Sequence, residues 1–298
     1  MDLKEYIKSK RPNLSAGSLA TYKSILSNLY SKFHDGEKKN IDVSFFSKNY
    51  KEILDHLKDV EPVKRKTTLS ALVVVCDDDV CKYYREPMME DIKHAKSISI
   101  EQKMTDKQKQ NWITQDQLRE KFDSLYDALK VKLVQKKIEP KTLSEFSDLL
   151  LLALTSGLYI PPRRSLDWTE MKVKGYDKKK DNYIMKGKFY FNRYKTDKTY
   201  GLEVIDIPAE LQTLLKKYIS YLPSSQEYLF VNNKGTKINS VKVALTLNKI
   251  FGKNVSINAL RHSYITEKYK GVPALKEMML TAQQMGHSLE TALEYIKK

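Results

Sequence analysis

The spacing of apolar residues predicts helices over most of the first hundred positions. Between residues 18 and 33, and again between 43 and 60, apolar side chains recur at three- and four-residue steps, which places them on one face of a helix. A third helix is predicted to start near Pro62 and to run through Val75. The N-terminal third of the chain is therefore predicted to be helical.

The pattern changes twice in the rest of the chain. A helix capped by Thr114 and an apolar helix from about Leu143 to Leu154 come first. Residues 182–208 then alternate and are rich in Tyr, Phe, Ile and Val, which predicts a short antiparallel sheet with a hairpin turn near 197–201. Helical spacing resumes at Pro208 and continues to the end.

Polar, charged residues without periodicity separate the two parts. They predict a linker over 98–111, between a helical domain at 1–97 and a second domain at 112–298. A length of 298 residues is comfortable for two domains. The predicted fold class is mainly α with a small antiparallel β-sheet, in two domains.

The charge balance indicates a polyanionic partner. The formal net charge is +16 and the isoelectric point is about 9.4, which predicts attraction to nucleic acid first and to an acidic membrane second. The membrane is disfavoured because no apolar run reaches about 18 residues and no basic amphipathic helix is found. The N-terminus lacks a hydrophobic signal core, so we expect an intracellular protein that is not secreted.

The cysteines do not indicate a structural framework. Cys76 and Cys81 are the only two, and no histidine pattern accompanies them. We expect both to be small buried hydrophobic residues, without a disulfide framework and without a metal.

Cationic and imidazole side chains stand beside apolar residues in three stretches of the second half. "SGLYIPPRRSLDWTEM" carries Arg163 and Arg164, "INALRHSYITEKY" carries Arg261, and "MGHSLETALEY" carries His287 and Tyr295. Arginine is seldom buried without a partner, and few acidic residues lie nearby in sequence. A phosphate matches the guanidinium fork. Two arginines, an imidazole and a phenol are the groups needed to transfer a phosphodiester to a protein oxygen.

The order of these motifs resembles the catalytic domain of the tyrosine recombinase (phage integrase) superfamily. The motifs are "G-L-x-x-P-P-R-R…D-W", "Y-K-T…Y-G" on a hairpin, "L-R-H-S" and "G-H…Y". The resemblance covers roughly Trp112 to the C-terminus, and the helical N-terminal region is similar to the core-binding domain of that family. The Pro-Pro-Arg-Arg form resembles integrases carried by large DNA viruses and their mobile elements.

The resemblance implies roles for the first arginine and for a hairpin lysine. Arg164 corresponds to the first family arginine, with Asp167 in place of the usual acid, although the family arginine normally follows Gly-Leu directly. Arg163 is the alternative and is otherwise expected to contact backbone or solvent. The lysine that would protonate the leaving 5′ oxygen is Lys195, with Lys198 as the second candidate.

The remaining catalytic roles fall on the C-terminal motifs. Arg261 corresponds to the second arginine, and Asn258 stands where most relatives carry histidine or lysine. Asparagine can donate a hydrogen bond to a phosphate but cannot shuttle a proton. His287 would steady the transition state, or alternatively cap a helix, and Tyr295 would be the nucleophile rather than an apolar residue of a terminal helix. His262 is expected to face the core.

The implied function is site-specific DNA recombination or integration through a covalent 3′-phosphotyrosyl intermediate, without metal or other cofactor. The partner is double-stranded DNA, with self-association into a tetramer on paired sites. Lys64, Arg65 and Lys66 would approach a DNA groove, or alternatively form a solvated helix end. A type IB topoisomerase and a catalytically silent DNA-binding protein are the alternative functions. The protein would act wherever its target DNA lies, in the cytoplasm, the nucleus or a viral factory.

Overall fold

The computed structural model describes residues 2–35, 38, 41–286 and 288–295, which fall into two compact units. Met1–Lys103 and Pro273–Lys298 make up the first unit, and Met104–Val272 make up the second. The structure therefore groups the C-terminal segment with the N-terminal helices. The sequence places that segment in the second domain instead, and the domain boundaries stay a prediction.

The first unit is built of helices alone in its described residues. Its core is formed by apolar faces of the helices at the N-terminal end of the chain, with Leu26, Phe46 and Leu72 fully buried. The described part of the chain has no helix that is both long enough and apolar enough to cross a bilayer. The elements are α1 (Leu3–Lys10), α2 (Ala16–Phe33), α3 (Phe45–Lys48), α4 (Tyr50–Leu57), α5 (Pro62–Val75), α6 (Asp78–Ile100), α15 (Leu275–Gln284) and α16 (Leu289–Glu294).

The helices predicted from apolar spacing at 18–33 and 62–75 are confirmed as α2 and α5, whereas one other prediction needs correction. The helix predicted over 43–60 is broken into α3 and α4 at Asn49, whose side-chain amide donates to the carbonyl of Phe45. The stretch 98–111, predicted to be a linker, contains the end of α6 at Ile100 and a capped helix, α7 (Asp106–Gln110). Thr105 and Gln108 form the capping box of α7, a local signal that outweighs its lack of apolar spacing.

The two cysteines are buried as expected but are also joined. The structure pairs Cys76 and Cys81 in a disulfide across the corner between α5 and α6. Five positions separate them, and the turn between the helices brings their Cα atoms within 5.7 Å of each other. A two-cysteine count gives no indication of this local pairing, so the sequence prediction of two unpaired hydrophobic residues is wrong.

In the basic run Lys64–Lys66 at the start of α5, one residue, Arg65, forms a structural ion pair. Arg65 donates from Nε and Nη2 to the two carboxylate oxygens of Asp91 on α6, at 2.9 and 2.7 Å, and from Nη1 to the carbonyl of Lys58. The Asp91 side chain is only 2% exposed and that of Arg65 is 21% exposed. Lys64 is exposed on the same turn, and Lys66 is half-buried.

Replacing Arg65 by alanine is expected to lower the free energy of unfolding by about 3 kcal/mol. The change would leave the buried carboxylate of Asp91 without its cation, and breaking a buried pair from one side costs about 3–5 kcal/mol. Urea unfolding followed by circular dichroism measures the loss. Lys64→Ala, in the same turn but exposed, is the control and is expected to change stability by less than about 0.5 kcal/mol. Equal stability of the two variants would contradict a structural role for Arg65.

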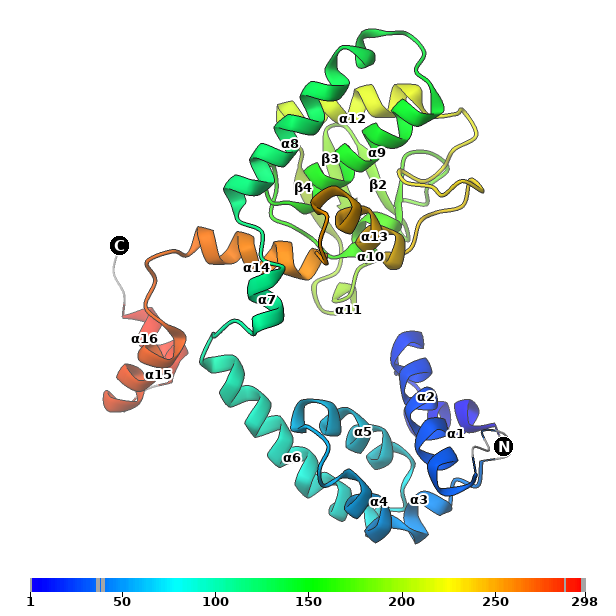
Figure 1. The fold of residues 1–298 in the computed structure, drawn as a ribbon, viewed down its shortest axis with the longest axis vertical. Helices are drawn as coiled ribbons and strands as arrows, with labels where there is room; N and C mark the ends of the chain where they lie inside the picture. Colours follow the sequence, from blue (N-terminus) through cyan, green and yellow to red (C-terminus); the bar gives the residue numbers. More distant parts are fainter. Residues whose placement is uncertain (1, 36–37, 39–40, 287, 296–298) are drawn as a thin grey trace. The chain divides into compact units, whose positions relative to one another are not determined.

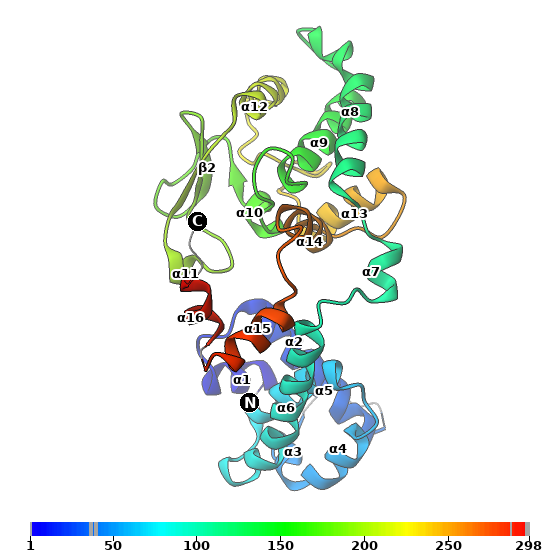
Figure 2. The same cartoon turned by 90° about the vertical axis from the view of Figure 1, so that its left-hand side faces the viewer.

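The second unit packs helices against a small sheet that lies at its edge (Figures 1 and 2). Its central helix is α9 (Pro140–Thr155), which contacts both α8 (Gln115–Lys130) and α12 (Ala209–Tyr221). Thr114 and Gln117 form a capping box at the start of α8, which confirms the predicted cap. The other elements are the 3-10 turn η1 (Lys132–Val134), α10 (Ser165–Thr169), β1 (Met171–Lys172), β2 (Asn182–Met185), β3 (Lys188–Phe191), α11 (Asp197–Tyr200), β4 (Glu203–Asp206), α13 (Ser240–Phe251) and α14 (Ile257–Lys268).

The sheet has the order β1-β2-β3-β4. Strands β2, β3 and β4 pair antiparallel, as the alternation predicts, and the β3–β4 connection contains the short helix α11. Strand β1 adds a parallel pairing with β2, so the sheet is mixed rather than purely antiparallel. Alternation cannot reveal a strand of two residues. The mainly helical fold class with a small sheet is confirmed.

The core of the second unit lies between α9 and the sheet. Residues 149–154 are all buried, as their continuous apolar run predicts. Trp168 of α10 is fully buried with its ring edge-to-face against Phe189 and Phe191 of β3, at centroid distances of 5.2 and 5.5 Å. These contacts anchor α10, and with it the arginine pair that precedes this helix, to the sheet.

Candidate functional site

Three arginines from distant parts of the chain meet at one cavity in the second unit. Arg163 and Arg164 precede α10, and Arg261 lies 97 positions after Arg164, in the second turn of α14. The cavity has a volume of about 240 Å³. It is lined by Pro161, Pro162, Arg163, Arg164, Asp167, Tyr194, Thr196, Glu203, Ile205 and Arg261.

A close approach between a loop and a helix brings the arginines together. The loop after α9 passes Gly157, which has a φ of +92°, and a Cβ there would lie 2.4 Å from the ring of Tyr264. Tyr264 lies on α14, three residues after Arg261. Only glycine combines this backbone conformation with the lack of a side chain. The loop that leads to Arg164 can therefore pack directly on the helix that carries Arg261.

Two hydrogen bonds from Gln115 tie the same elements together. Its side-chain amide, at the start of α8, donates to the carbonyl of Ser156 and to the hydroxyl of Ser263 at 3.4 and 3.2 Å. Ser263 is buried in α14 and is the serine of the "L-R-H-S" motif. The end of α9, the start of α8 and the arginine-bearing helix are thus linked through one side chain.

Arg163 forms ion pairs with two neighbouring carboxylates. Its Nε donates to Asp167 at 2.7 Å, and its Nη1 donates to Glu203 of β4. The guanidinium also lies over the ring of Phe191, 4.1 Å from the centroid, a favourable cation–π geometry. The expectation that Arg163 contacts backbone or solvent is wrong, because the strand pairing brings Glu203 to it from 40 positions away.

Arg164 and Arg261 have no such partners. Within the described residues, neither guanidinium makes a hydrogen bond or an ion pair. Burial lowers the pKa of Arg261, and the positive charge of Arg164 lowers it further, against the raising effect of Asp167. Because arginine stays protonated, this shift expresses repulsion between two neighbouring cations in a partly buried place. An anion between them would relieve that repulsion.

Asp167 is also incompletely paired. It is 3% exposed, and its Oδ1 has no hydrogen-bond partner in the part of the chain that the structure describes, while Oδ2 accepts from Arg163. Burial raises the pKa of the Asp167 carboxyl, although Arg163 and Arg164 oppose the rise. The pair Arg163–Asp167 therefore forms a buried support behind the two unpaired arginines.

Replacing Arg163 by alanine is expected to cost about 3–5 kcal/mol of folding free energy. Asp167 would be left buried without its cation, which is the costly way to break a buried pair. Arg164→Ala is the matched control, since it removes the adjacent guanidinium without breaking any ion pair of the described residues, and we expect its change in stability to stay below about 1 kcal/mol. Urea unfolding compares the two, and an equal loss in both variants would contradict the division of roles.

The lysine candidates lie on the loop beside the cavity. Lys195 lies between Tyr194 and Thr196, which both line the cavity, but its own side chain is exposed and is not part of the lining. Lys198 is exposed on α11, further along the same loop. The structure thus brings the backbone of Lys195 to the site and leaves its side chain free to turn.

The first turns of α14 place two further candidates. Asn258 is exposed, three positions before Arg261, and does not line the cavity. His262 is also exposed, so the expectation that it faces the core is wrong. The buried positions of this helix are Ile257, Leu260 and Ser263, and their spacing directs the neighbouring His262 to the opposite side.

Of the two C-terminal candidates, the structure describes Tyr295, which belongs to the first unit. Tyr295 follows α16, its side chain is 59% exposed, and its backbone N–H donates to the carbonyl of Ala292. His287 lies outside the described residues. The catalytic roles of Arg164, Lys195, Arg261, His287 and Tyr295, and the DNA-contact role of Lys64, Arg65 and Lys66, stay predictions.

Glu203 and Tyr194 are site residues that the sequence reasoning missed. Both line the cavity, and the Tyr194 hydroxyl donates to the carbonyl of Gly201 at 2.8 Å. The alternation of inward- and outward-facing residues along β4 could have predicted the position of Glu203. Ile205 and Ile207 face inward, so a residue two positions before Ile205 is expected on the same face.

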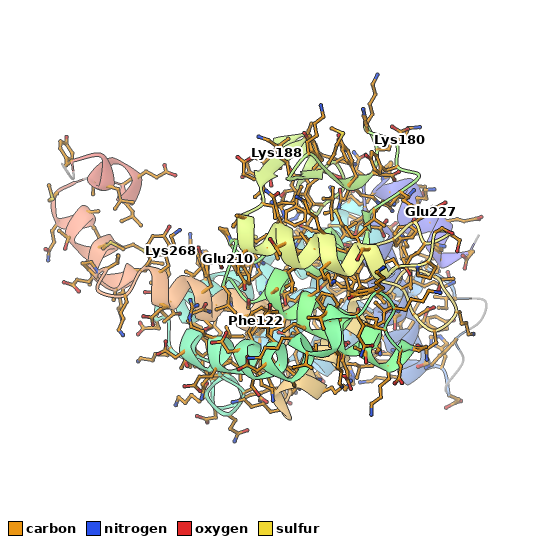
Figure 3. All side chains as sticks on the ribbon, turned by 90° about the horizontal axis from the view of Figure 1, so that it is seen from above. Phe122, Lys180, Lys188, Glu210, Glu227 and Lys268 are labelled. Carbon is orange, nitrogen blue, oxygen red and sulfur yellow. A yellow bond between two sulfur atoms is a disulfide. The ribbon has the colours of Figure 1, made fainter. Side chains whose placement is uncertain are left out.

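The surroundings of the sheet carry further basic groups. Lys180 and Lys188 extend from the β1–β2 connection and from β3 in the view of Figure 3. Lys188 contacts Asp206 at 2.9 Å, whereas Lys180 is largely exposed and lies 3.7 Å from Asp177. Among the described side chains there is no group of three or more His, Cys, Asp or Glu residues that could hold a metal ion.

Comparison with solved structures finds similar chains at low identity, among them the following three. A XerA recombinase is 14% identical with a TM-score of 0.37, over 99% of this chain and 91% of that one. XerH site-specific recombinase bound to difH substrate in a pre-cleavage complex is 17% identical with a TM-score of 0.42, over 99% and 91%. XerH bound to a palindromic difH substrate in a post-cleavage complex is 16% identical with a TM-score of 0.43, over 97% and 89%. No family model and no curated protein sequence matches this chain.

Proposed function

We propose that this protein breaks and rejoins DNA strands as a tyrosine recombinase, through a covalent bond between Tyr295 and a 3′ phosphate. The observation that carries the proposal is the convergence of Arg164 and Arg261 on one cavity without an anionic partner among the described residues. Arg163, one position away, holds two carboxylates. Acidic side chains therefore lie close to the cavity, yet the guanidinium groups of Arg164 and Arg261 pair with none of them. Two such unpaired cations suit the binding of a phosphate.

The proposed reaction transfers a phosphodiester to a tyrosine oxygen and back. The Tyr295 hydroxyl gives up its proton to water as its oxygen attacks the phosphorus. The bond to the 5′ oxygen breaks, and that oxygen takes a proton from Lys195. Arg164, Arg261 and His287 neutralise the charge on the non-bridging oxygens, which is the main help a protein gives to phosphoryl transfer. A 5′ hydroxyl then attacks the phosphotyrosine and releases Tyr295. The phosphotyrosyl ester retains the energy of the broken phosphodiester bond, so the cycle consumes no nucleotide cofactor.

Covalent capture on randomised DNA tests the proposal and identifies the target sequence in the same experiment. A pool of duplexes with a randomised centre carries a nick placed so that the cleaved fragment diffuses away and religation is prevented. We expect an adduct between protein and DNA that survives SDS, and sequencing of the captured DNA should reveal one enriched site. The DNA that flanks the gene is a second source of substrate, because inverted repeats there would supply the paired sites.

The captured sequences separate the alternative functions. Adducts without sequence preference, together with relaxation of plasmids that lack any special site, would favour a type IB topoisomerase. Failure to form any adduct, with DNA binding intact, would favour a catalytically silent binder. Enrichment of one sequence favours site-specific recombination.

The finer parts of the proposal concern partners and origin. The net charge of +16 would provide sequence-independent affinity for double-stranded DNA, so binding should fall steeply with salt. Lys64 and Lys66 would approach the duplex, while Arg65 holds the helix that presents them. A tetramer on two paired sites would exchange strands. A source in a large DNA virus or its mobile element is part of the same proposal.

A further inference from the structure

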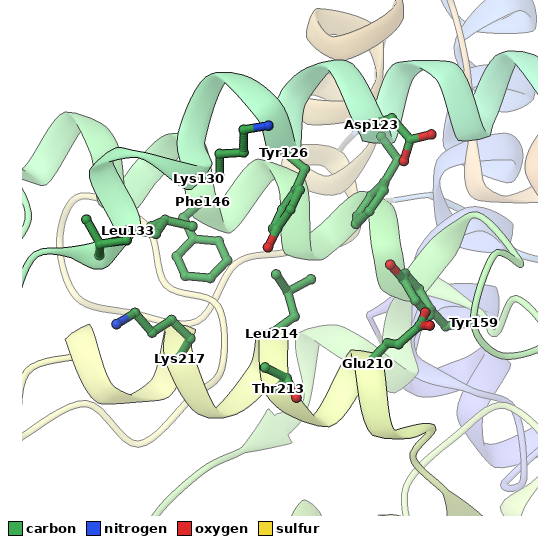
Figure 4. Close-up of a pocket in the computed structure, with 12 residues that line it drawn as sticks. Asp123, Tyr126, Lys130, Leu133, Phe146, Tyr159, Glu210, Thr213, Leu214 and Lys217 are labelled. Atoms are coloured by element: carbon green, nitrogen blue, oxygen red, sulfur yellow. The ribbon is translucent and has the colours of Figure 1, made fainter.

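A second cavity of the same unit is a groove between helices that the proposed reaction does not use. It has a volume of about 620 Å³, within the range of ligand sites in proteins. Helices α8 and α12 form its two walls, with Phe146 of α9 at its floor (Figure 4). Figure 3 shows Phe122 on α8 and Glu210 on α12, on the two helices that border it.

The groove is apolar along its length and charged at its ends. The rings of Phe122, Tyr126, Phe146 and Tyr159 line it together with Leu214. Some of this apolar surface faces solvent, since Val134, a lining residue in the turn η1, is 77% exposed. An exposed apolar surface of this kind, with a polar rim, is typical of an interaction site.

The residues that line the two ends carry opposite charge, and at the basic end Lys130 also forms an exposed ion pair with Asp127 at 2.8 Å. The walls run in the same direction, so that Asp123 and Glu210 share one end and Lys130 and Lys217 share the other (Figure 4). Seven positions separate the acidic from the basic residue on each helix, which is about two helical turns or 10 Å. The groove therefore has the length and the charge pattern to complement a short amphipathic helix.

The two carboxylates of the acidic end have no ion-pair partner among the described residues. Lysine and arginine number 53 against 37 aspartates and glutamates, yet neither Asp123 nor Glu210 makes a hydrogen bond or an ion pair with any described residue. Burial raises the pKa of Tyr159, the charges of Glu210 and Asp123 raise it further, and the charge of Arg119 opposes the rise. Arg119 therefore lies close enough to act on this end, but it leaves both carboxylates available to pair with a cation of a partner.

We propose that this groove binds an amphipathic α-helix of a partner protein, antiparallel to α8 and α12. The partner helix would carry acidic residues in its first turn, opposite Lys130 and Lys217, and an apolar stripe in its middle. Its last turn would carry lysine or arginine, opposite Asp123 and Glu210. This charge order is the one that helices favour, because it complements their own dipole. Apolar anchors in the groove would give affinity, and the end charges would set direction.

The proposal is independent of DNA cleavage. No residue of this groove lines the arginine cavity, because the two sets of lining residues do not overlap. A failure of the groove to bind a helix would leave the proposed function unchanged, and the reverse also holds.

The test uses two synthetic helical peptides of about 14 residues, labelled at one end and capped at both. Both carry leucines at the i, i+3, i+4 and i+7 spacing. The first has glutamates in its first turn and arginines in its last turn, and the second has these charges exchanged. Fluorescence anisotropy with the full-length protein should show the first peptide binding at least about tenfold more tightly than the second.

Charge reversal at the acidic end of the groove should abolish this preference, because both ends would then be basic. Asp123→Lys with Glu210→Lys removes the acidic end, and both side chains are exposed, so folding should be retained. The variant should bind the first peptide at least about tenfold more weakly than the wild type does. Asp116→Lys with Glu120→Lys, at two exposed positions of α8 outside the groove, makes the same change in net charge and should keep the wild-type preference.

Three results would overturn the proposal. They are the absence of saturable binding of either peptide, equal affinity for both, or a preference that survives the reversal at Asp123 and Glu210. Sedimentation of the protein alone addresses a second copy of the chain as the occupant. Self-association that is lost in the charge-reversed variant would replace the partner helix by a second copy.

Discussion

Replacing Tyr295 by phenylalanine is expected to abolish the protein–DNA adduct and to reduce strand cleavage by at least about 10⁴-fold. The change removes one oxygen atom, the proposed nucleophile, and keeps the aromatic ring. Without the nucleophile, the covalent intermediate cannot form. Only the rate enhancement that comes from binding and from charge stabilisation then remains. Quenched cleavage of a suicide duplex, followed by SDS gel electrophoresis, measures the effect.

The control for this variant is another exposed tyrosine. Tyr269, at the end of α14, is 55% exposed, close to the 59% of Tyr295, and lies outside the arginine cavity. Tyr269→Phe should cleave DNA at the wild-type rate. Because Tyr295→Phe keeps the ring, DNA affinity should stay near that of the wild type in both variants. An adduct of normal yield in Tyr295→Phe would exclude Tyr295 as the attacking group.

Replacing either Arg164 or Arg261 by alanine is expected to lower the cleavage rate by about 10³–10⁵-fold. An arginine that neutralises the transferring phosphoryl group contributes an effect of that size. Because the two guanidinium groups serve one phosphate, the double variant should lose much less than the product of the two single losses. Single-turnover cleavage at saturating protein separates this effect from weaker DNA binding.

The structure predicts that these losses occur in folded protein. Arg164 and Arg261 form no ion pair with other described residues, so their removal leaves no buried carboxylate behind. Lysine at either position should restore only part of the rate, since it cannot contact two phosphate oxygens as a fork. Full activity of Arg164→Ala would move the catalytic role away from this residue.

Local signals in the sequence predicted much of the fold. The apolar spacing of α2 and α5, the cap of α8 and the alternation of β2 to β4 each depend on neighbours within a few positions. The long helix α6 lies in the region predicted to be helical, but its bounds were not predicted, because it contains Pro87 and many charged residues. The break at Asn49 was missed because the apolar spacing continues across it.

The site was predicted in part, and the missing part depends on tertiary contacts. The arginine-rich motifs pointed to Arg164 and Arg261, which the structure brings to one cavity. The sequence could not assign Arg163, because its partner Glu203 is remote in the chain and reaches it only when β4 pairs with β3. The groove between α8 and α12 was not foreseen for the same reason, since its walls are about 80 positions apart.

Identification of the residue that carries the DNA in the trapped adduct tests the central claim most directly. The adduct is digested with nuclease and protease, and the modified peptide is sequenced by mass spectrometry. We predict a nucleotide joined through its 3′ phosphate to the oxygen of Tyr295, in wild-type protein and, at much lower yield, in Arg164→Ala. A nucleotide on a serine, on a histidine or on another tyrosine, or a 5′ phosphate link, would contradict the proposed mechanism.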